Sequence, residues 1–199
     1  MESDDSTYDW LNRQIFRSLV WSPFDAGKPF LPHDSIGVLI TKDVIRKVLT
    51  SDDGSKAPEG ELVDWIHRTA AKIFAITIQC DIGWDKTLKS MRSFQQLEFN
   101  DESLSIDDPR STSDQEQPQP FLDRCWNPQR RYRFWEYQWR CLSPVFAADQ
   151  YDYDLSSECI LPFIWKDERV RVGAFSSVYR VKIHPAHQEH ELKDVRAQY

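Results

Sequence analysis

The feature that most constrains the fold is an apolar stripe that runs from Glu61 to Cys80. Its members are apolar apart from one threonine, and they recur at alternating intervals of four and three residues. This spacing places side chains on one face of an α-helix, and such a face is buried against the rest of a domain. The members are Leu62, Ile66, Thr69, Ile73, Ile76 and Cys80. We therefore predict one central, buried helix over residues 61–80.

Residues 6–99 as a whole are predicted to form a helical region. Three further helices are expected, each beginning at a capping residue or after a turn and continuing with apolar residues at helical spacing. Their approximate ranges are 6–20, 41–49 and 84–97. Three apolar residues in the loop after the first helix, Phe24, Phe30 and Leu31, are expected to hold that loop against the core.

Residues 100–120 interrupt the helical pattern. The segment contains six acidic residues and one basic residue, Arg110, with serine, glutamine and proline between them. This composition is typical of a solvated linker or an exposed loop, because it offers little apolar surface to bury. We assign the segment to that class.

The region 121–158 contains an aromatic helix and an acidic connector. In a helix from about Arg131 to Leu142, the rings of Tyr132, Trp135 and Trp139 share one face. Arginines between aromatic residues are also found where proteins bind single-stranded nucleic acid, which makes residues 130–140 a candidate for that activity. The net charge of −7 opposes it, because nucleic acid is itself negative. We favour a packing helix whose arginines pair with nearby carboxylates.

The region 159–199 is predicted to contain a β-hairpin. An apolar run at residues 160–165 precedes a charged stretch and a short turn, Gly173 to Ser177. Residues 178–183 then alternate between apolar and polar side chains, which is the period of a half-buried strand. Strand, glycine-containing turn and strand together predict two antiparallel strands.

This hairpin resembles the opening of the eukaryotic protein kinase fold, whose first two strands hold a glycine-rich loop over the phosphates of ATP. Aligned on Val178, the three glycine positions are Arg171, Gly173 and Ser176, so only the middle glycine is kept. The continuation from Val178 to His187 is similar to kinase-like proteins of filamentous fungi. A second stretch that shares the similarity comprises Gln138-Trp139 and Pro144-Val145-Phe146. The resemblance implies that the nucleotide-contacting residues of a complete relative are Val172, Gly173, Ala174, Phe175, Ser176 and Val178.

The motifs that carry kinase chemistry are absent from the sequence. A kinase requires a strand-three lysine in a V-A-I-K context, an H-R-D catalytic loop and a D-F-G aspartate that binds magnesium. None of these strings occurs before the last residue, Tyr199. Lys182 aligns with the second strand and Lys193 precedes the third, so neither matches the catalytic lysine. We expect no catalytic residue and no cofactor in this chain, because ATP and Mg²⁺ would bind only in a complete relative.

Metal-binding and targeting motifs give little support to other functions. His184, His187 and His190 recur every three residues, but no cysteine lies near them to complete a zinc site, and we expect an exposed loop. The four cysteines form no C-x-x-C pair and are expected to be free thiols in a reducing compartment. The acidic N-terminus lacks a signal-peptide pattern, and no apolar run approaches the ~20 residues that span a bilayer. We expect an intracellular protein, cytoplasmic or nuclear, that does not bind membranes.

The sequence therefore predicts a mainly α fold, with a helical N-terminal region and a C-terminal β-hairpin that resembles strands 1 and 2 of a protein kinase small lobe. The expected function is that of a non-catalytic N-terminal fragment of a protein kinase-like protein, whose family transfers phosphate from ATP to proteins. The alternative is a protein–protein interaction module that uses the aromatic helical region. The partner expected under this alternative is another protein, and nucleic acid is disfavoured.

Overall fold

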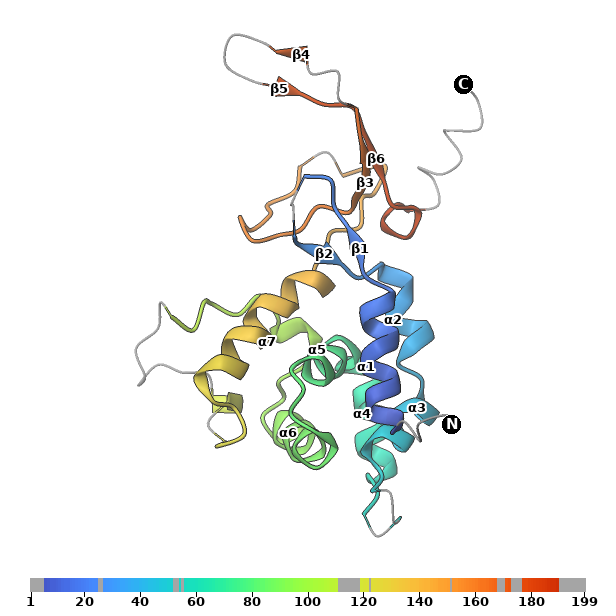
Figure 1. The fold of residues 1–199 in the computed structure, drawn as a ribbon, viewed down its shortest axis with the longest axis vertical. Coiled ribbons are helices and arrows are strands. Elements are labelled where there is room, and N and C mark those ends of the chain that lie inside the picture. The colour runs from blue at the N-terminus through green and yellow to red at the C-terminus, as the bar shows by residue number, and fades with distance from the viewer. Residues whose placement is uncertain are drawn as a thin grey trace, which may run out of the picture. The chain divides into compact units, whose positions relative to one another are not determined.

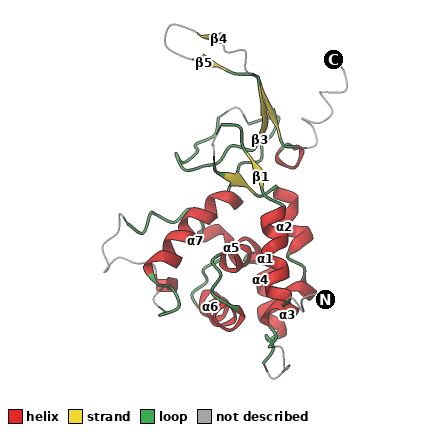
Figure 2. Cartoon of the chain, viewed as in Figure 1, coloured by secondary structure: helices red, strands yellow, loops and turns green. Residues whose placement is uncertain are grey.

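The structure is a computed structural model that describes residues 6–24, 27–51, 54, 56–110, 119–121, 123–150, 152–167, 171–172 and 177–189 (Figure 1). The chain is mainly helical, as the sequence predicts (Figure 2). It divides into two compact units. Unit 1 comprises Met1–Ser18 and Ser35–Gln138, and unit 2 comprises Leu19–Asp34 and Trp139–Tyr199. No helix in the described ranges is long and apolar enough to cross a membrane.

Unit 1 contains most of the helices. Its elements are α1 (Thr7–Arg17), α3 (Lys42–Leu49), α4 (Gly60–Thr69), α5 (Ala71–Gln79), α6 (Trp84–Gln96), and the short 3-10 helices η1 (Asp101–Ser103) and η2 (Gln119–Phe121). Two helices cross the division between the units: α2 (His33–Leu39) and α7 (Pro128–Cys141). Within unit 1, α5 packs against α1, α4 and α6, and α3 packs against α1, α4 and α6.

The helix starts predicted from capping residues are confirmed. The Ser6 hydroxyl accepts a hydrogen bond from the Asp9 amide (3.2 Å), and the Thr41 hydroxyl accepts one from the Val44 amide (3.3 Å). These bonds satisfy amides that have no partner inside the first turn of a helix. The first helix ends at Arg17, three residues before the predicted end, and the chain continues into a strand at Val20.

The prediction of a single helix over residues 61–80 is wrong, because the helix is broken at Ala70. This residue lies at φ −136° and ψ 28°, outside the helical range, and it separates α4 from α5. The apolar spacing continues across the break, so the pattern alone does not reveal it. The second piece, α5, has an unbroken buried run from Ile73 to Ile78 and is the most enclosed helix of unit 1. A helix that is apolar on all sides belongs in the middle of a core.

The start of α5 is capped by a residue from a remote part of the chain. Ala70 has no side chain that can accept a hydrogen bond, and the two carboxylate oxygens of Asp101 accept the amides of Lys72 and Ile73 instead, both at 3.0 Å. Burial raises the pKa of the Asp101 carboxyl, against the opposing effect of these backbone hydrogen bonds. Asp101 therefore acts as the N-cap of α5 from a position about thirty residues further along the chain.

The described part of residues 100–120, predicted as a solvated linker or exposed loop, is held to unit 1 by buried contacts that composition did not predict. Besides Asp101, Leu104 is buried, and the side chain of Gln138 in α7 binds the backbone that follows. Gln138 Oε1 accepts the amides of Ser105 and Ile106, and its Nε2 donates to the Ile106 carbonyl, all at 2.9 Å. The composition of the segment is polar and therefore indicated a loop. Composition does not show which of the polar groups form hydrogen bonds with buried partners. Residues 111–118 of this segment lie outside the described residues.

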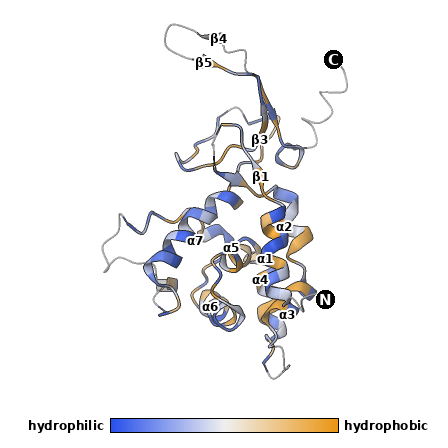
Figure 3. Cartoon of the chain, viewed as in Figure 1, coloured by the Kyte–Doolittle hydropathy of each residue, from blue (hydrophilic) through white to orange (hydrophobic). Residues whose placement is uncertain are grey.

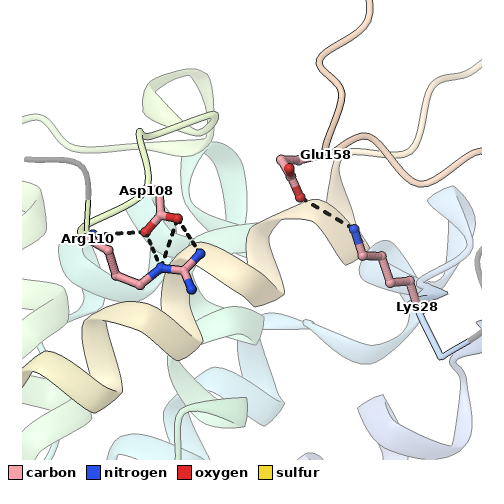
Figure 4. Close-up of polar contacts among 4 residues, drawn as sticks. All are labelled: Lys28, Asp108, Arg110 and Glu158. Atoms are coloured by element: carbon pink, nitrogen blue, oxygen red, sulfur yellow. Dashed lines mark hydrogen bonds and ion pairs between the residues drawn. The ribbon is translucent and has the colours of Figure 1, made fainter.

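Arg110 also fixes this segment to α7. Its guanidinium pairs with Asp108 (Figure 4) and lies over the ring of Tyr132, 4.6 Å from the centroid, and of Trp135, 5.6 Å away. A cation over an aromatic face is attracted by the ring quadrupole by about 0.5–1 kcal/mol at an exposed site. Residues 100–110 are thus attached to unit 1 at three places.

The predicted aromatic helix is confirmed as α7, although it begins three residues early, at Pro128. Asn127 caps it by accepting the Arg130 amide (2.9 Å), and proline at the first helical position is favoured because its missing N–H would have no partner there. Figure 3 colours α7 mostly hydrophilic, yet Phe134 is fully buried. We expected the arginines of this helix to pair with carboxylates. The guanidinium of Arg130 instead donates a hydrogen bond to the Cys125 carbonyl at 3.0 Å.

A cluster of rings joins α7 to α6 and η2 within unit 1. The ring centroids lie 4.9 to 6.4 Å apart, mostly in tilted or edge-to-face arrangements, which aromatic rings prefer. The cluster consists of Phe94, Phe99, Phe121, Trp126 and Phe134. The indole N–H of Trp126 donates to the Ser90 hydroxyl (3.1 Å), so its polar edge is satisfied inside the core. The high aromatic content of the sequence is therefore used in part for packing.

Unit 2 is built from short antiparallel strand pairs. Its elements are β1 (Val20–Trp21), β2 (Pro29–Phe30), β3 (Phe163–Lys166), β4 (Arg171–Val172), β5 (Ser177–Val178), β6 (Val181–Ile183) and the 3-10 helix η3 (Pro185–His187). The pairs are β1 with β2, β3 with β6, and β4 with β5. A small core of Phe30, Trp139 and Ile160 lies among them, so the prediction that Phe30 holds its loop to a core is confirmed.

Asp101→Ala is expected to lower the free energy of unfolding by about 1–2 kcal/mol, the usual cost of losing a helix cap. Urea unfolding followed by circular dichroism at 222 nm measures this change. Asp101→Asn keeps one acceptor oxygen and should fall between wild type and Asp101→Ala. Glu102→Ala is the matched control, because Glu102 is the exposed neighbour in η1. Equal stability of Asp101→Ala and Glu102→Ala would contradict the capping role.

Candidate functional site

The residues that the kinase resemblance singles out lie around the turn between β4 and β5. Val172 in β4 pairs with Ser177 in β5, and Arg171 pairs with Val178. These two pairs make residues 173–176 the connection of an antiparallel hairpin. Gly173, Ala174, Phe175 and Ser176 themselves lie outside the described residues. Of the predicted nucleotide-contacting set, the structure thus places the backbone of Val172 and the whole of Val178, whose side chain is 61% exposed.

The base of the hairpin is formed by β3 and β6. Phe163 pairs with Ile183, Trp165 with Lys182 and Lys166 with Val181, and one irregularity in register lies between the first two pairs. The antiparallel hairpin predicted from alternation is therefore confirmed over these residues. Lys182 lies in β6, the second of these two strands. The indole of Trp165 is 47% exposed on this hairpin.

A lysine held between two aromatic rings fixes the base of the hairpin. Lys166 Nζ lies 4.4 Å from the ring centroid of Phe24 and 4.1 Å from that of Tyr179. Phe24 also meets Tyr179 and Phe163 edge-on, with centroids 5.5 and 5.4 Å apart. Phe24 comes from the segment between β1 and β2, so this contact joins the N-terminal and C-terminal stretches of unit 2.

A second link between these two stretches is an ion pair. Lys28 Nζ lies 3.4 Å from a carboxylate oxygen of Glu158 (Figure 4). Both side chains are substantially exposed, and such a pair contributes about 0–1 kcal/mol. The ion pair therefore adds little to the aromatic contact of Lys166, which joins the same two stretches.

A buried histidine lies where the chain leaves the hairpin. His187 in η3 is 1% exposed, and its Nε2 accepts the backbone amide of His33 at 3.1 Å. Its Nδ1 lies 2.9 Å from the Pro144 carbonyl oxygen. The ring also meets Phe30 edge-on, with centroids 5.2 Å apart. Burial lowers the pKa of His187, and the neighbouring rings of His184 and His33 lower it further.

The prediction of an exposed loop over these histidines is wrong for His187. His184 caps η3, because its Nδ1 accepts the amide of Ala186 at 3.2 Å, and burial lowers its pKa as well. His190 lies outside the described residues. Among the residues that the structure describes, no group of three or more histidine, cysteine, aspartate or glutamate side chains could hold a metal ion.

Sequence reasoning missed two of the side chains that shape this region, Lys166 and His33, and predicted the wrong surroundings for a third, His187. Lys166 belongs to the charged stretch that follows the apolar run, and nothing local indicates that a ring 142 residues earlier will meet it. The only signal for His187 is that it follows a proline and an alanine next to a strand, which is consistent with a tight, enclosed turn. These partners come from remote parts of the chain, so one sequence gives no direct evidence for the contacts.

Comparisons of the chain with protein-family models, with curated proteins and with solved structures found no match.

Phe24 and Lys166 are expected to be coupled by about 0.5–1 kcal/mol. A double-mutant cycle of Phe24→Leu and Lys166→Met, measured by urea unfolding, gives this value. Lys166→Met keeps the apolar length of the side chain and removes the charge. Lys182→Met in the same hairpin is the matched control, because Lys182 is exposed. A coupling with Lys166 no larger than that with Lys182 would show that the cation contributes nothing here.

Proposed function

We propose that this chain is the non-catalytic N-terminal part of a protein kinase-like protein, ending within the first strands of a kinase small lobe. The single observation that supports this proposal is the pairing of Val172 with Ser177. This pair flanks residues 173–176, where the resemblance requires the phosphate loop. The fragment Gly173-Ala174-Phe175-Ser176-Ser177-Val178 then corresponds to the kept middle glycine, the aromatic tip and the valine of that loop.

The chain is proposed to be non-catalytic because the groups that perform phosphoryl transfer are missing from its sequence. The reaction depends on metal ions that neutralise the phosphates and on a base that positions the attacking hydroxyl. The two lysines of the hairpin do not replace the strand-three lysine. Lys166 is held between two rings, and Lys182 lies on the strand after the turn.

The altered loop is a second reason to propose that the chain is non-catalytic. Arg171 and Ser176 occupy positions at which the kinase loop has glycines. Glycine alone freely adopts the unusual backbone angles that let a loop approach a phosphate closely. A loop with two of its three glycines replaced is stiffer, and nucleotide binding is expected to be weak even in a complete relative.

The alternative proposal, a protein–protein interaction module, is favoured by a different observation. Two large side chains of α1 are exposed in unit 1, Trp10 at 40% and Phe16 at 63%. Tryptophan and phenylalanine are enriched at the centres of protein interfaces. The rings around α7 that first suggested this function are less available, since Trp126 and Phe134 are buried. If the chain recognises a protein, α1 is the element that we propose for it.

Full-length sequencing of the transcripts that encode this chain tests its proposed origin. We expect transcripts in which the reading frame continues past Tyr199 into a strand-three lysine, an H-R-D loop and a D-F-G motif. Transcripts that all end at Tyr199, or that continue without these motifs, would contradict the kinase-like origin.

Mg-ATP is expected to produce no saturable rise in the melting temperature of this chain. A ligand that binds only the folded state raises its stability in proportion to the logarithm of ligand concentration, so a titration into the millimolar range detects even weak binding. Val178→Asp serves as the site control, because it places a negative charge where the adenine would lie. A saturable rise in the wild type that this variant abolishes would show that the altered loop binds nucleotide.

A further inference from the structure

His187 ties together three separate stretches of unit 2. Its ring contacts the backbone at His33, the first residue of α2, and at Pro144, which follows α7. Its own backbone carbonyl accepts the amide of Phe146 (2.9 Å), and the Phe146 carbonyl accepts the amide of Glu189 (3.0 Å). The ring and the main chain of this one residue therefore hold residues 33, 144–146 and 187–189 in place.

The neutral form of the His187 ring fits its contacts with His33 and Pro144, and burial favours that form although the backbone of Leu31 favours the charged one. Nε2 accepts a hydrogen bond from an amide N–H, so it carries no proton. The neutral ring then carries its proton on Nδ1, which donates to the Pro144 carbonyl. An imidazolium would place a second N–H against the His33 N–H. Protonation thus breaks one of the two bonds and leaves a buried charge.

We propose that His187 is an acid-released clasp of unit 2, closed while its ring is neutral and opened when the ring takes up a proton. The titratable and charged groups that face it are His33 and Asp34 at the start of α2 and His184 before η3. His33 and His184 oppose a positive charge on His187. Asp34 is exposed, and its charge acts on His184.

The direction of the pH effect follows from these surroundings. The pKa of His187 in the folded chain lies below the ordinary value of 6.5, with burial as the main cause. The unfolded chain therefore takes up a proton at a higher pH than the folded chain does. The contribution of His187 to stability is complete above pH 6.5 and is lost as the pH falls from 6.5 through the folded pKa. Within this window the unfolding equilibrium constant rises by up to about tenfold per pH unit.

When the clasp opens, we expect the segments next to His187 to lose their contacts as well. Gln188 is also buried, and its side chain donates to the carbonyls of Ile183 (2.8 Å) and His184 (3.3 Å). The Phe30 ring packs against both His184 and His187. Loss of the His33 bond therefore loosens η3 and the end of β6 together.

Nuclear magnetic resonance of the ¹⁵N-labelled full chain between pH 7.5 and 5.0 tests the proposal directly. The ring nitrogen shifts of His187 report its tautomer and charge, and the amides of His33, Phe146 and Glu189 report the clasp. We expect a neutral ring with the proton on Nδ1 at pH 7.5. Below pH 6.5, the three amide signals should leave their native positions together as the ring becomes charged.

Two variants separate the clasp from general acid effects. His187→Gln keeps an acceptor and a donor but cannot become charged, so the joint shift of the amides below pH 6.5 should disappear. His67→Gln is the matched control, because His67 is an exposed histidine of α4 in unit 1, and it should leave the shift intact. The proposal is overturned if His187 becomes charged while the three amides keep their native positions. A proton on Nε2 at pH 7.5 overturns it as well, and this wild-type measurement decides the question even if His187→Gln does not fold.

Discussion

The fold of unit 1 depends on a carboxylate that satisfies the first amides of its central helix. Ala70 ends one helix and begins another without offering an acceptor, and Asp101 supplies two. Leaving a buried amide without a partner costs about 1–3 kcal/mol, so the break in the apolar helix is tolerated only because Asp101 is there. The raised pKa of Asp101 shows that its carboxylate is partly withdrawn from water to make these bonds. The burial of Ile73 to Ile78 follows from a helix that starts at this point.

The same physical arrangement recurs elsewhere in the chain. Gln138 binds the backbone of Ser105 and Ile106 with both ends of its amide, and His187 binds the backbone at His33 and Pro144 with both ring nitrogens. In each case a buried polar side chain replaces the partner that regular secondary structure would have given to a backbone group. Such groups specify how irregular segments lie, because an apolar substitute would leave backbone groups unpaired. The histidine differs from the other two in that burial lowers the pKa of its ring, so that the neutral form makes both contacts.

Much of the helical fold could be predicted from the sequence, and the reasons for the errors are physical. Helices α1 and α3 were predicted from apolar spacing with capping residues, and α6 and α7 from apolar and aromatic spacing. In contrast, α2 buries no residue, and β1 and β2 have two residues each, too few to show a period. The break at Ala70 and the packing of residues 100–110 depend on Asp101 and Gln138 binding partners about thirty residues away. At the candidate site, alternation predicted the hairpin strands. The enclosure of His187 could not be predicted, because the residues it binds are 154 and 43 positions distant.

Native-state hydrogen exchange tests most directly whether, within each unit, side chains from remote segments hold the backbone in place. The amides to measure are those that bond to a side chain: Lys72 and Ile73 on Asp101, Ser105 and Ile106 on Gln138, and His33 on His187. We predict that at neutral pH they exchange as slowly as the helical amides of their own unit, because opening them requires those contacts to break. Exchange at the rate of an exposed loop would contradict the account.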